Sequence, residues 1–381
     1  MKQVVYITVK QSPMYHQLSI EDLLLGDFRG SALISANTSN TRTYAVERVS
    51  AKFMSRLDIL KLIRKLESFN AATASLREIP RKDLYHSFSI PKRHGGLRHI
   101  NAPNPDLMSA LRLLKTIFEQ DFCALYHTNA FAYVQGRCTL DAIKRHQANE
   151  SRWFAKLDLH DFFGSTTPEF VMKMFSMVFP FSEIVRYPQG KAALETALDL
   201  AFLDGGLPQG TPISPTITNV MMIPIDYQLS KRFRDFNGQK LIYTRYADDF
   251  TISSRNTFSV GDVERAVMDT LRKYDAKFTL NQSKTRYGSS SGRNWNLGLM
   301  LNKDNQITVG YKRKKQLQTM LFNYIMDRQN GTPWPVEDIR TMYGLYSYYH
   351  MVEPDVIDAI IEHVNKKMDV SVIGMIKADL Q

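Results

Sequence analysis

The chain has 381 residues, 44% of them hydrophobic, so it is long enough for two or three subdomains that share a core, and its composition excludes a disordered arm. Lys and Arg (49) exceed Asp and Glu (38), and the net charge of +11 indicates a polyanionic partner, either nucleic acid or an acidic membrane surface. No run of about 18 apolar residues occurs and no signal-like segment begins the chain, so we expect a cytoplasmic protein without a membrane span.

Residues 1–80 precede the recognisable motifs and are interpreted as an N-terminal extension. One stretch of it predicts a helix with an apolar packing face. That face carries Phe53, Leu57, Leu60, Ile63 and Leu66. Three roles remain open for the extension: recognition of RNA, contact with a second subunit, or support of the segment that follows.

A basic β-hairpin is predicted next, followed by a helix. Pro and Gly punctuate the segment around Gly95-Gly96, and the apolar periodicity of 107–122 indicates the helix. Lys92 and Arg98 flank the turn, and two cations on a movable hairpin can clamp a triphosphate. The alternative is a solvated basic hairpin without a ligand.

The middle of the chain alternates strands and helices. Residues 152–158 predict a buried strand that ends in Asp158, and a helix-rich connection follows to about Phe202. Residues 241–254 predict two strands joined at Ala247, Asp248 and Asp249. This alternation favours an α+β fold, with helices on one face of an antiparallel sheet.

The last 70 or so residues predict a small helical subdomain with a charged edge. It begins with the basic run Lys312, Arg313, Lys314 and Lys315, after which apolar residues recur at helix spacing. The basic run is a candidate for holding nucleic-acid phosphates. A simple surface helix is the competing interpretation.

Asp158 and the pair Asp248-Asp249 are the strongest candidates for chemistry. They follow or join predicted strands, and no cluster of His or Cys lies near them in the sequence. Hard oxygen ligands select Mg²⁺ or Mn²⁺ over zinc. Two such ions can activate a 3′-hydroxyl and stabilise a leaving pyrophosphate. Taken alone, the acid pair is better explained as an ordinary turn, because Asp is a favoured turn residue.

Tyr246-Ala247-Asp248-Asp249 resembles the YxDD box of reverse transcriptases, and 154–163 resembles the first acidic motif of that family. The resemblance implies that two Mg²⁺ ions, with Mn²⁺ as the alternative, bind Asp158, the adjacent Leu159, Asp248 and Asp249. It also implies that Phe163 is a steric gate that favours dNTPs over rNTPs.

Three further segments agree with this family in the same order. Residues 207–215 resemble the QGxxxSP motif, which implies that Gln209 packs on the incoming dNTP together with Tyr246, while Lys92 and Arg98 hold its phosphates. Residues 280–285 resemble the motif after the catalytic hairpin, so Lys284 is a candidate to protonate or stabilise the pyrophosphate, or else an exposed structural lysine. Residues 297–299 resemble the primer grip.

The forms of these motifs are similar to retron, group II intron and defence-associated bacterial reverse transcriptases. Two retron boxes differ, because residues 141–146 replace NAxxH and residues 296–298 stand near the VTG position. The resemblance implies a right-hand polymerase. Its expected parts are the extension 1–80, fingers 81–150, a palm 151–302 with finger insertions, and a helical thumb 303–381.

The expected function is RNA-directed DNA synthesis. We expect a structured non-coding RNA as template and primer, cDNA as product, and a role in antiphage defence. One alternative is a template-independent or protein-primed polymerase of the same fold, and another is a non-catalytic RNA-binding scaffold. An effector protein or a second copy of the chain is an open partner.

Overall fold

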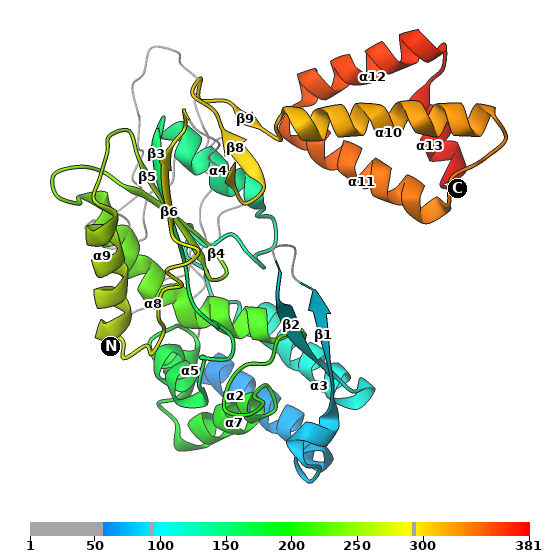
Figure 1. Cartoon of the computed structure of the whole chain (residues 1–381). Coiled ribbons are helices and arrows are strands. Elements are labelled where there is room, and N and C mark those ends of the chain that lie inside the picture. The colour runs from blue at the N-terminus through cyan, green and yellow to red at the C-terminus, as the bar shows by residue number, and fades with distance from the viewer. Residues whose placement is uncertain (1–55, 92–94, 292–294) are drawn as a thin grey trace, which may run out of the picture. The chain divides into compact units, whose positions relative to one another are not determined.

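The computed structural model describes residues 56–91, 95–291 and 295–381 (Figure 1). The chain divides into two units, 1–61 and 62–381. Of the first unit, only the start of helix α2 (Arg56–Ala72) is described. Within the second unit, Ile63 and Leu66 of this helix are buried, as the apolar periodicity predicts. Phe53 of the predicted helix face and Lys92 of the predicted hairpin lie outside the described residues.

The predicted basic hairpin and its following helix are confirmed. Strands β1 (Tyr85–Pro91) and β2 (Leu97–Pro103) pair antiparallel, and α3 (Pro105–Thr116) follows directly. Helix α3 begins where Asn104 accepts a hydrogen bond from the Leu107 N–H and Pro105 occupies the first turn. A π-helical turn extends it over Ile117–Phe122. Most of the hairpin is exposed, so it projects from the core rather than forming part of it.

A four-stranded antiparallel sheet forms the centre of the second unit. Its order is β4 (Ile242–Tyr246), β5 (Asp249–Ser254), β3 (Trp153–Asp158) and β6 (Arg286–Ser289). The predicted strand ending in Asp158 and the predicted hairpin with two acids at its turn are therefore both present. This register places Asp158 directly opposite Asp249.

Helices cover the sheet on both faces. The predicted helical face is formed by α8 (Ser214–Arg234), which packs on the sheet and against α9 (Val260–Lys273). On the opposite face lies α4 (Thr139–Ala148), whose buried His146 is hydrogen-bonded to Thr244 Oγ1 at 2.8 Å. The predicted helix-rich connection after β3 comprises α5 (Pro168–Phe175), α6 (Phe181–Ile184) and α7 (Pro188–Asp199).

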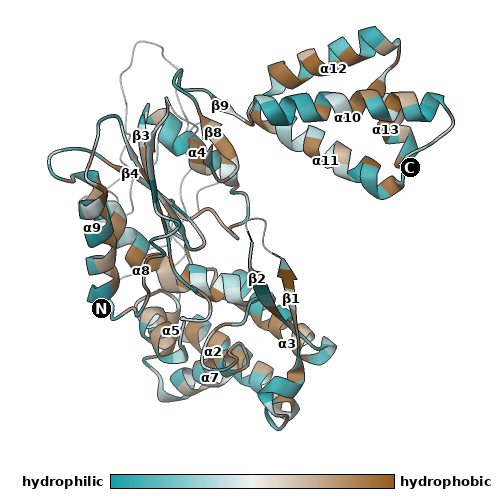
Figure 2. Cartoon of the chain, in the orientation of Figure 1, coloured by the Kyte–Doolittle hydropathy of each residue, from teal (hydrophilic) through white to brown (hydrophobic). Residues whose placement is uncertain are grey.

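The C-terminal region is helical, as predicted. It follows a three-stranded sheet of β7 (Trp295–Asn296), β8 (Leu299–Leu301) and β9 (Ile307–Thr308). The helices are α10 (Tyr311–Gln329), α11 (Val336–Val352), α12 (Pro354–Met368) and α13 (Val372–Asp379). Apolar positions recur along them (Figure 2), and each contributes buried side chains to a shared core. No helix among the described residues combines the length and apolar composition needed to cross a bilayer.

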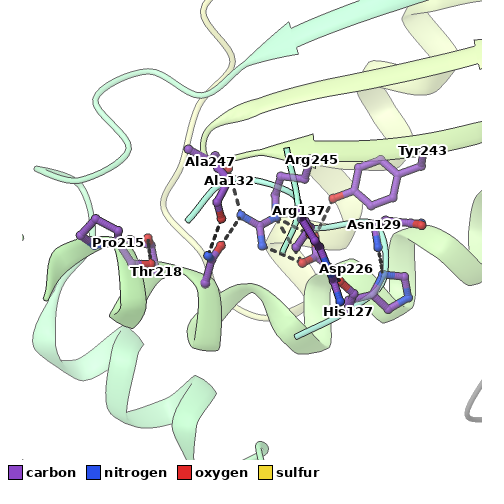
Figure 3. Close-up of polar contacts among 12 residues, drawn as sticks. His127, Asn129, Ala132, Arg137, Pro215, Thr218, Asp226, Tyr243, Arg245 and Ala247 are labelled. Atoms are coloured by element: carbon purple, nitrogen blue, oxygen red, sulfur yellow. Dashed lines mark hydrogen bonds and ion pairs between the residues drawn. The ribbon is translucent and has the colours of Figure 1, made fainter. Parts of the chain in front are cut away.

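A buried ion pair ties the central sheet to α8 (Figure 3). Arg245 of β4 and Asp226 of α8 are at most 1% exposed. Arg245 Nε and Nη2 donate to the Asp226 carboxylate at 2.9 and 2.8 Å, and the Tyr243 hydroxyl donates to the same carboxylate at 2.7 Å. Both charges are thus paired and hydrogen-bonded, which is the condition for stable burial of charge.

The same arginine anchors two further segments. Its Nη1 donates to the Ala247 carbonyl at 3.1 Å and to Asn219 Oδ1 at 3.2 Å, while Asn219 Nδ2 donates to the Ala132 carbonyl at 2.7 Å. The Arg245 main chain also bonds to the Asn129 carbonyl and the Phe131 N–H. Helix α8, the β4–β5 turn and residues 129–132 therefore form one hydrogen-bonded block.

Replacing Asp226 with Asn keeps the volume of the side chain but leaves the Arg245 charge buried without a counterion. We expect the free energy of unfolding to fall by about 3 kcal/mol or more. Urea denaturation followed by circular dichroism would measure it. Glu337→Gln is the control, because its ion pair with Arg340 is exposed and should contribute less than about 1 kcal/mol. A loss for Asp226→Asn as small as that of the control would contradict this account.

Candidate active site

The β4–β5 turn presents two carboxylates at the end of the sheet. Tyr246 and Asp249 pair across the hairpin, so Ala247 and Asp248 form a two-residue turn. Ala247 has a φ of 57°, a left-handed conformation that costs energy for a residue with a Cβ. The hydrogen bond from Arg245 to the Ala247 carbonyl holds this conformation. The buried Arg245 side chain therefore fixes the conformation of the β4–β5 turn.

Asp158 meets this turn from the neighbouring strand. It pairs with Asp249 in register, and the Leu159 N–H donates to the Asp248 carbonyl at 3.2 Å. Directly opposed residues of antiparallel strands have Cα atoms about 5 Å apart. The structure thus brings together the three acids that the sequence singles out, although they lie about 90 residues apart along the chain.

The three carboxylates influence one another electrostatically. Desolvation, followed by the charges of Asp248 and Asp158, raises the pKa of Asp249 to about 7. Desolvation, with a smaller contribution from Asp158, also raises the pKa of Asp248. The carboxylates thus repel one another in addition to being desolvated, and a bound cation would offset both effects.

Two lysines lie beside these acids. Lys284 Nζ is 2.9 Å from each oxygen of the Asp158 carboxylate. Although desolvation opposes it, this interaction raises the pKa of Lys284, so the lysine stays charged. Lys156 precedes Asp158 by two residues on the same strand face, where desolvation lowers its pKa to about 8 while Asp249 opposes the change. The structure thus places Lys284 at Asp158, and its role toward the pyrophosphate stays a prediction.

The donor set suits a divalent cation. Within the described residues, no three acidic, His or Cys side chains already stand in a complete metal-binding arrangement, and both oxygens of Asp158 face Lys284. The carboxylates of Asp158, Asp248 and Asp249 nevertheless converge, and hard oxygen donors of this kind select Mg²⁺ or Mn²⁺. Leu159 is 1% exposed and can offer only its main-chain carbonyl.

The loop before α8 is hydrogen-bonded both to the segment that follows β3 and to the basic hairpin. The Leu207 N–H donates to the Phe163 carbonyl at 3.0 Å, and the Gln209 carbonyl accepts from the Asn101 N–H of β2 at 2.9 Å. Gly210 has a φ of 114°, and a Cβ there would lie 2.9 Å from Ile100 Cγ2, so this close approach requires glycine. Hydrogen bonds of the loop before α8 thus join Phe163, Gln209 and the basic hairpin.

The basic hairpin contributes Arg98 to the neighbourhood of the acids. Arg98 is exposed, and its charge lowers the pKa of Asp248, against the larger effect of desolvation. Tyr246 is half-buried opposite Asp249. Among the predicted dNTP-binding residues, Arg98 and Tyr246 are therefore near the β4–β5 turn. The predicted role of Lys92 falls on a residue outside the described ranges.

The basic run at the start of α10 divides into two pairs. Arg313 lies 4.9 Å from the centre of the Trp295 ring and donates to the Gly298 carbonyl, while Lys314 forms a 2.7 Å ion pair with Glu353. Lys312 and Lys315 are exposed. The candidate phosphate contacts therefore narrow to Lys312 and Lys315, whereas Arg313 and Lys314 fasten α10 to neighbouring segments.

Sequence reasoning missed the residues that support the site. Arg245 had a detectable signal, because a charged residue inside a hydrophobic strand requires a buried partner. Asp226 carried the same kind of signal, because it follows the apolar residues 220–225 of its helix, but nothing in the sequence pairs it with Arg245. Tyr133 also escaped notice, although its exposed ring adjoins the block that holds the catalytic turn.

Comparisons with known proteins agree with the geometry. Residues 90–321, more than half of the chain, match the family described as "Reverse transcriptase (RNA-dependent DNA polymerase)". The retron Ec83 reverse transcriptase of Escherichia coli is 29% identical over 77% of this chain and 89% of its own length. The retron Mx162 reverse transcriptase of Myxococcus xanthus is 27% identical over 81% of this chain and 67% of its own.

Among solved structures, telomerase from Candida albicans with a fragment of telomeric RNA aligns with 78% of this chain and 59% of that chain. Its TM-score of 0.42 and identity of 13% are too low to support any comparison. The retron relatives match most of the chain even though residues 141–146 and 296–298 depart from two retron boxes. The chain belongs to the reverse transcriptase family, and is an RNA-directed DNA polymerase with the right-hand polymerase fold.

Proposed function

We propose that the chain copies a structured non-coding RNA into cDNA by two-metal nucleotidyl transfer, with Asp158, Asp248 and Asp249 as the metal-binding carboxylates. The observation that carries the mechanism is the convergence of these acids, with Asp158 and Asp249 in register on adjacent strands. The raised pKa of Asp249 supports it, because desolvation and the neighbouring carboxylates disfavour the charged form of Asp249, which a bound cation would stabilise.

Each residue of this site has a role in the proposal. Divalent ions, when bound, would activate the primer 3′-hydroxyl and stabilise the pyrophosphate. Asp158, Asp248 and Asp249 would hold them, with the Leu159 main-chain carbonyl as a further ligand. Lys284, which is held at Asp158, is positioned to place a positive charge near the leaving group. Mg²⁺ is the proposed ion and Mn²⁺ the substitute.

The incoming dNTP is assigned to the surface between the basic hairpin and the loop before α8. Arg98, and by its position in the sequence Lys92, would hold the phosphates, because cations neutralise the charge of a triphosphate. Gln209 and Tyr246 would pack against the nucleotide. Phe163 would exclude ribose. The hydrogen bond between Asn101 and Gln209 supports this assignment, because it joins the two sets of residues.

A defence role in bacteria is the proposed biological setting. It rests on the resemblance to retron and defence-associated enzymes and on the net charge of +11, which suits a permanently associated RNA. A cytoplasmic location and an effector partner belong to the same proposal. Residues 1–80 are proposed to contribute to RNA recognition or assembly, and thumb residues Lys312 and Lys315 to contact phosphates.

The carboxylates are tested by Asp248→Asn and Asp249→Asn. We expect each to lower the rate of DNA synthesis on an RNA template by about a thousandfold or more, since metal ligation supplies several kcal/mol of transition-state stabilisation. RNA binding, measured by fluorescence anisotropy, should be retained within a few-fold. Asp161→Asn is the control, because Asp161 lies in the first acidic motif three residues after Asp158 but is not one of the three converging acids. Synthesis by Asp249→Asn at the control rate would refute the assignment.

The steric gate is tested by Phe163→Ala. Removal of the half-buried ring should leave room for a 2′-hydroxyl, so the preference for dNTP over rNTP should fall by roughly tenfold to a hundredfold. The ratio of kcat/KM for dGTP and GTP on one template measures it. The kcat/KM for dGTP should change much less than that for GTP. An unchanged ratio would remove Phe163 from the nucleotide site.

The template is tested by purification of the chain from its native host, sequencing of the bound RNA, and sequencing of DNA made after addition of dNTPs and Mg²⁺. One structured RNA with complementary DNA is the expected result. Homopolymer DNA without a complementary template would instead support untemplated synthesis and overturn the proposal of a dedicated RNA.

A further inference from the structure

We propose that Tyr133 is a positioning residue for DNA synthesis, whose ring stacks against a nucleobase of the template–primer duplex beside the catalytic turn. This inference rests on the proposed function and adds a contact with the duplex that the motifs do not assign. Three observations carry it: the anchoring of the segment, the exposure of the ring, and the charges around it.

Tyr133 follows a segment that is fixed to the catalytic hairpin. The Asn219 side chain donates a hydrogen bond to the Ala132 carbonyl and accepts one from Arg245. Arg245 also donates to the Ala247 carbonyl of the β4–β5 turn. Figure 3 shows Ala132 and Ala247 on the same side of the Arg245 guanidinium. The Ala132 and Ala247 carbonyls are therefore linked through the side chains of Asn219 and Arg245 alone. Tyr133 follows Ala132 and Asp248 follows Ala247, so the main chains of Tyr133 and Asp248 lie close to each other.

The ring is exposed where its neighbours are buried. Ala130, Phe131 and Ala132 are at most 4% exposed, whereas Tyr133 is 57% exposed. Its φ of 57° is a left-handed conformation that bulky residues rarely adopt. Buried hydrogen bonds on the preceding residues hold this backbone, so the ring is kept at the surface by the fold. Strained residues of this kind gather at functional sites.

Charged groups of the basic hairpin and of the β4–β5 turn both act on the Tyr133 ring. Desolvation, followed by the charge of Asp248 and the nearby Tyr246, raises the pKa of Tyr133, and Arg98 opposes the change. Arg98 belongs to β2, and Asp248 to the catalytic turn. A neutral aromatic ring at this place adjoins both the proposed nucleotide phosphates and the proposed metal ligands.

A nucleobase is the ligand whose chemistry fits. An exposed aromatic face binds bases of any sequence by stacking. The duplex is favoured over the incoming dNTP because Tyr133 belongs to the block anchored by Arg245, which is fixed relative to the acids. Arg98, which is proposed to hold the dNTP phosphates, instead lies on the exposed part of β2.

The test uses the full chain with Tyr133→Asn and Tyr133→Phe. Asn tolerates a left-handed backbone, so it removes the ring without adding strain, and Phe retains the ring without the hydroxyl. We expect Tyr133→Asn to raise the Kd for a fluorescent RNA–DNA template–primer by about tenfold, as loss of one stacked base implies. Tyr133→Phe should remain within about twofold of the parent. The KM for dNTP at saturating duplex should not change.

Two outcomes would overturn the inference. In one, Tyr133→Asn binds the duplex as tightly as the parent chain. In the other, only the KM for dNTP rises, which would assign the ring to the nucleotide. The urea midpoint of both variants, if equal to that of the parent, shows that an effect on Kd is not caused by unfolding. Failure of the proposed function is distinguishable, because it would appear as DNA synthesis that Asp249→Asn does not reduce.

Discussion

The geometry of the active site depends on the buried pair Arg245–Asp226. Replacing a buried ion pair with apolar residues is often neutral for stability, so stability alone does not account for it. Its distinctive property is that one planar guanidinium offers five donors in a fixed fork. Here the fork bonds to Asp226 and Asn219 of α8 and to the Ala247 carbonyl. An aliphatic residue at 245 could fill the volume but could not set the orientation of the turn.

A second constraint is electrostatic. Asp158, Asp248 and Asp249 crowd one end of the sheet, and Lys284 offsets the charge of Asp158 from one side. Without a counterion, close carboxylates favour protonation, which would remove their ability to ligate a metal. Metal binding by these acids would therefore be coupled to their ionisation, and Lys284 would share Asp158 with a cation bound there.

Local patterns in the sequence predicted the local parts of the structure. The strand ending at Asp158, the hairpin around Asp248, the basic hairpin and the C-terminal helices each follow from periodicity and turn residues. Asp226, Asn219 and Tyr133 could not be predicted this way, since their roles arise from contacts between residues about 20 to 110 positions apart. The basic run at 312–315 illustrates the same limit, because only the fold determines which of its side chains are exposed. The domain boundaries and the roles of the site residues remain predictions.

The contact between Gly210 and β2 also determines how the basic hairpin can move. Asn101 is hydrogen-bonded to the Gln209 carbonyl, and the close approach of Gly210 to Ile100 leaves no room for sliding. The base of the hairpin is thus fastened, while residues 97–99 are exposed. Arg98 therefore lies on β2 beyond the contact that fastens Asn101 to Gln209. Any bending of β2 beyond Asn101 would change the distance between Arg98 and the acids without moving Gln209.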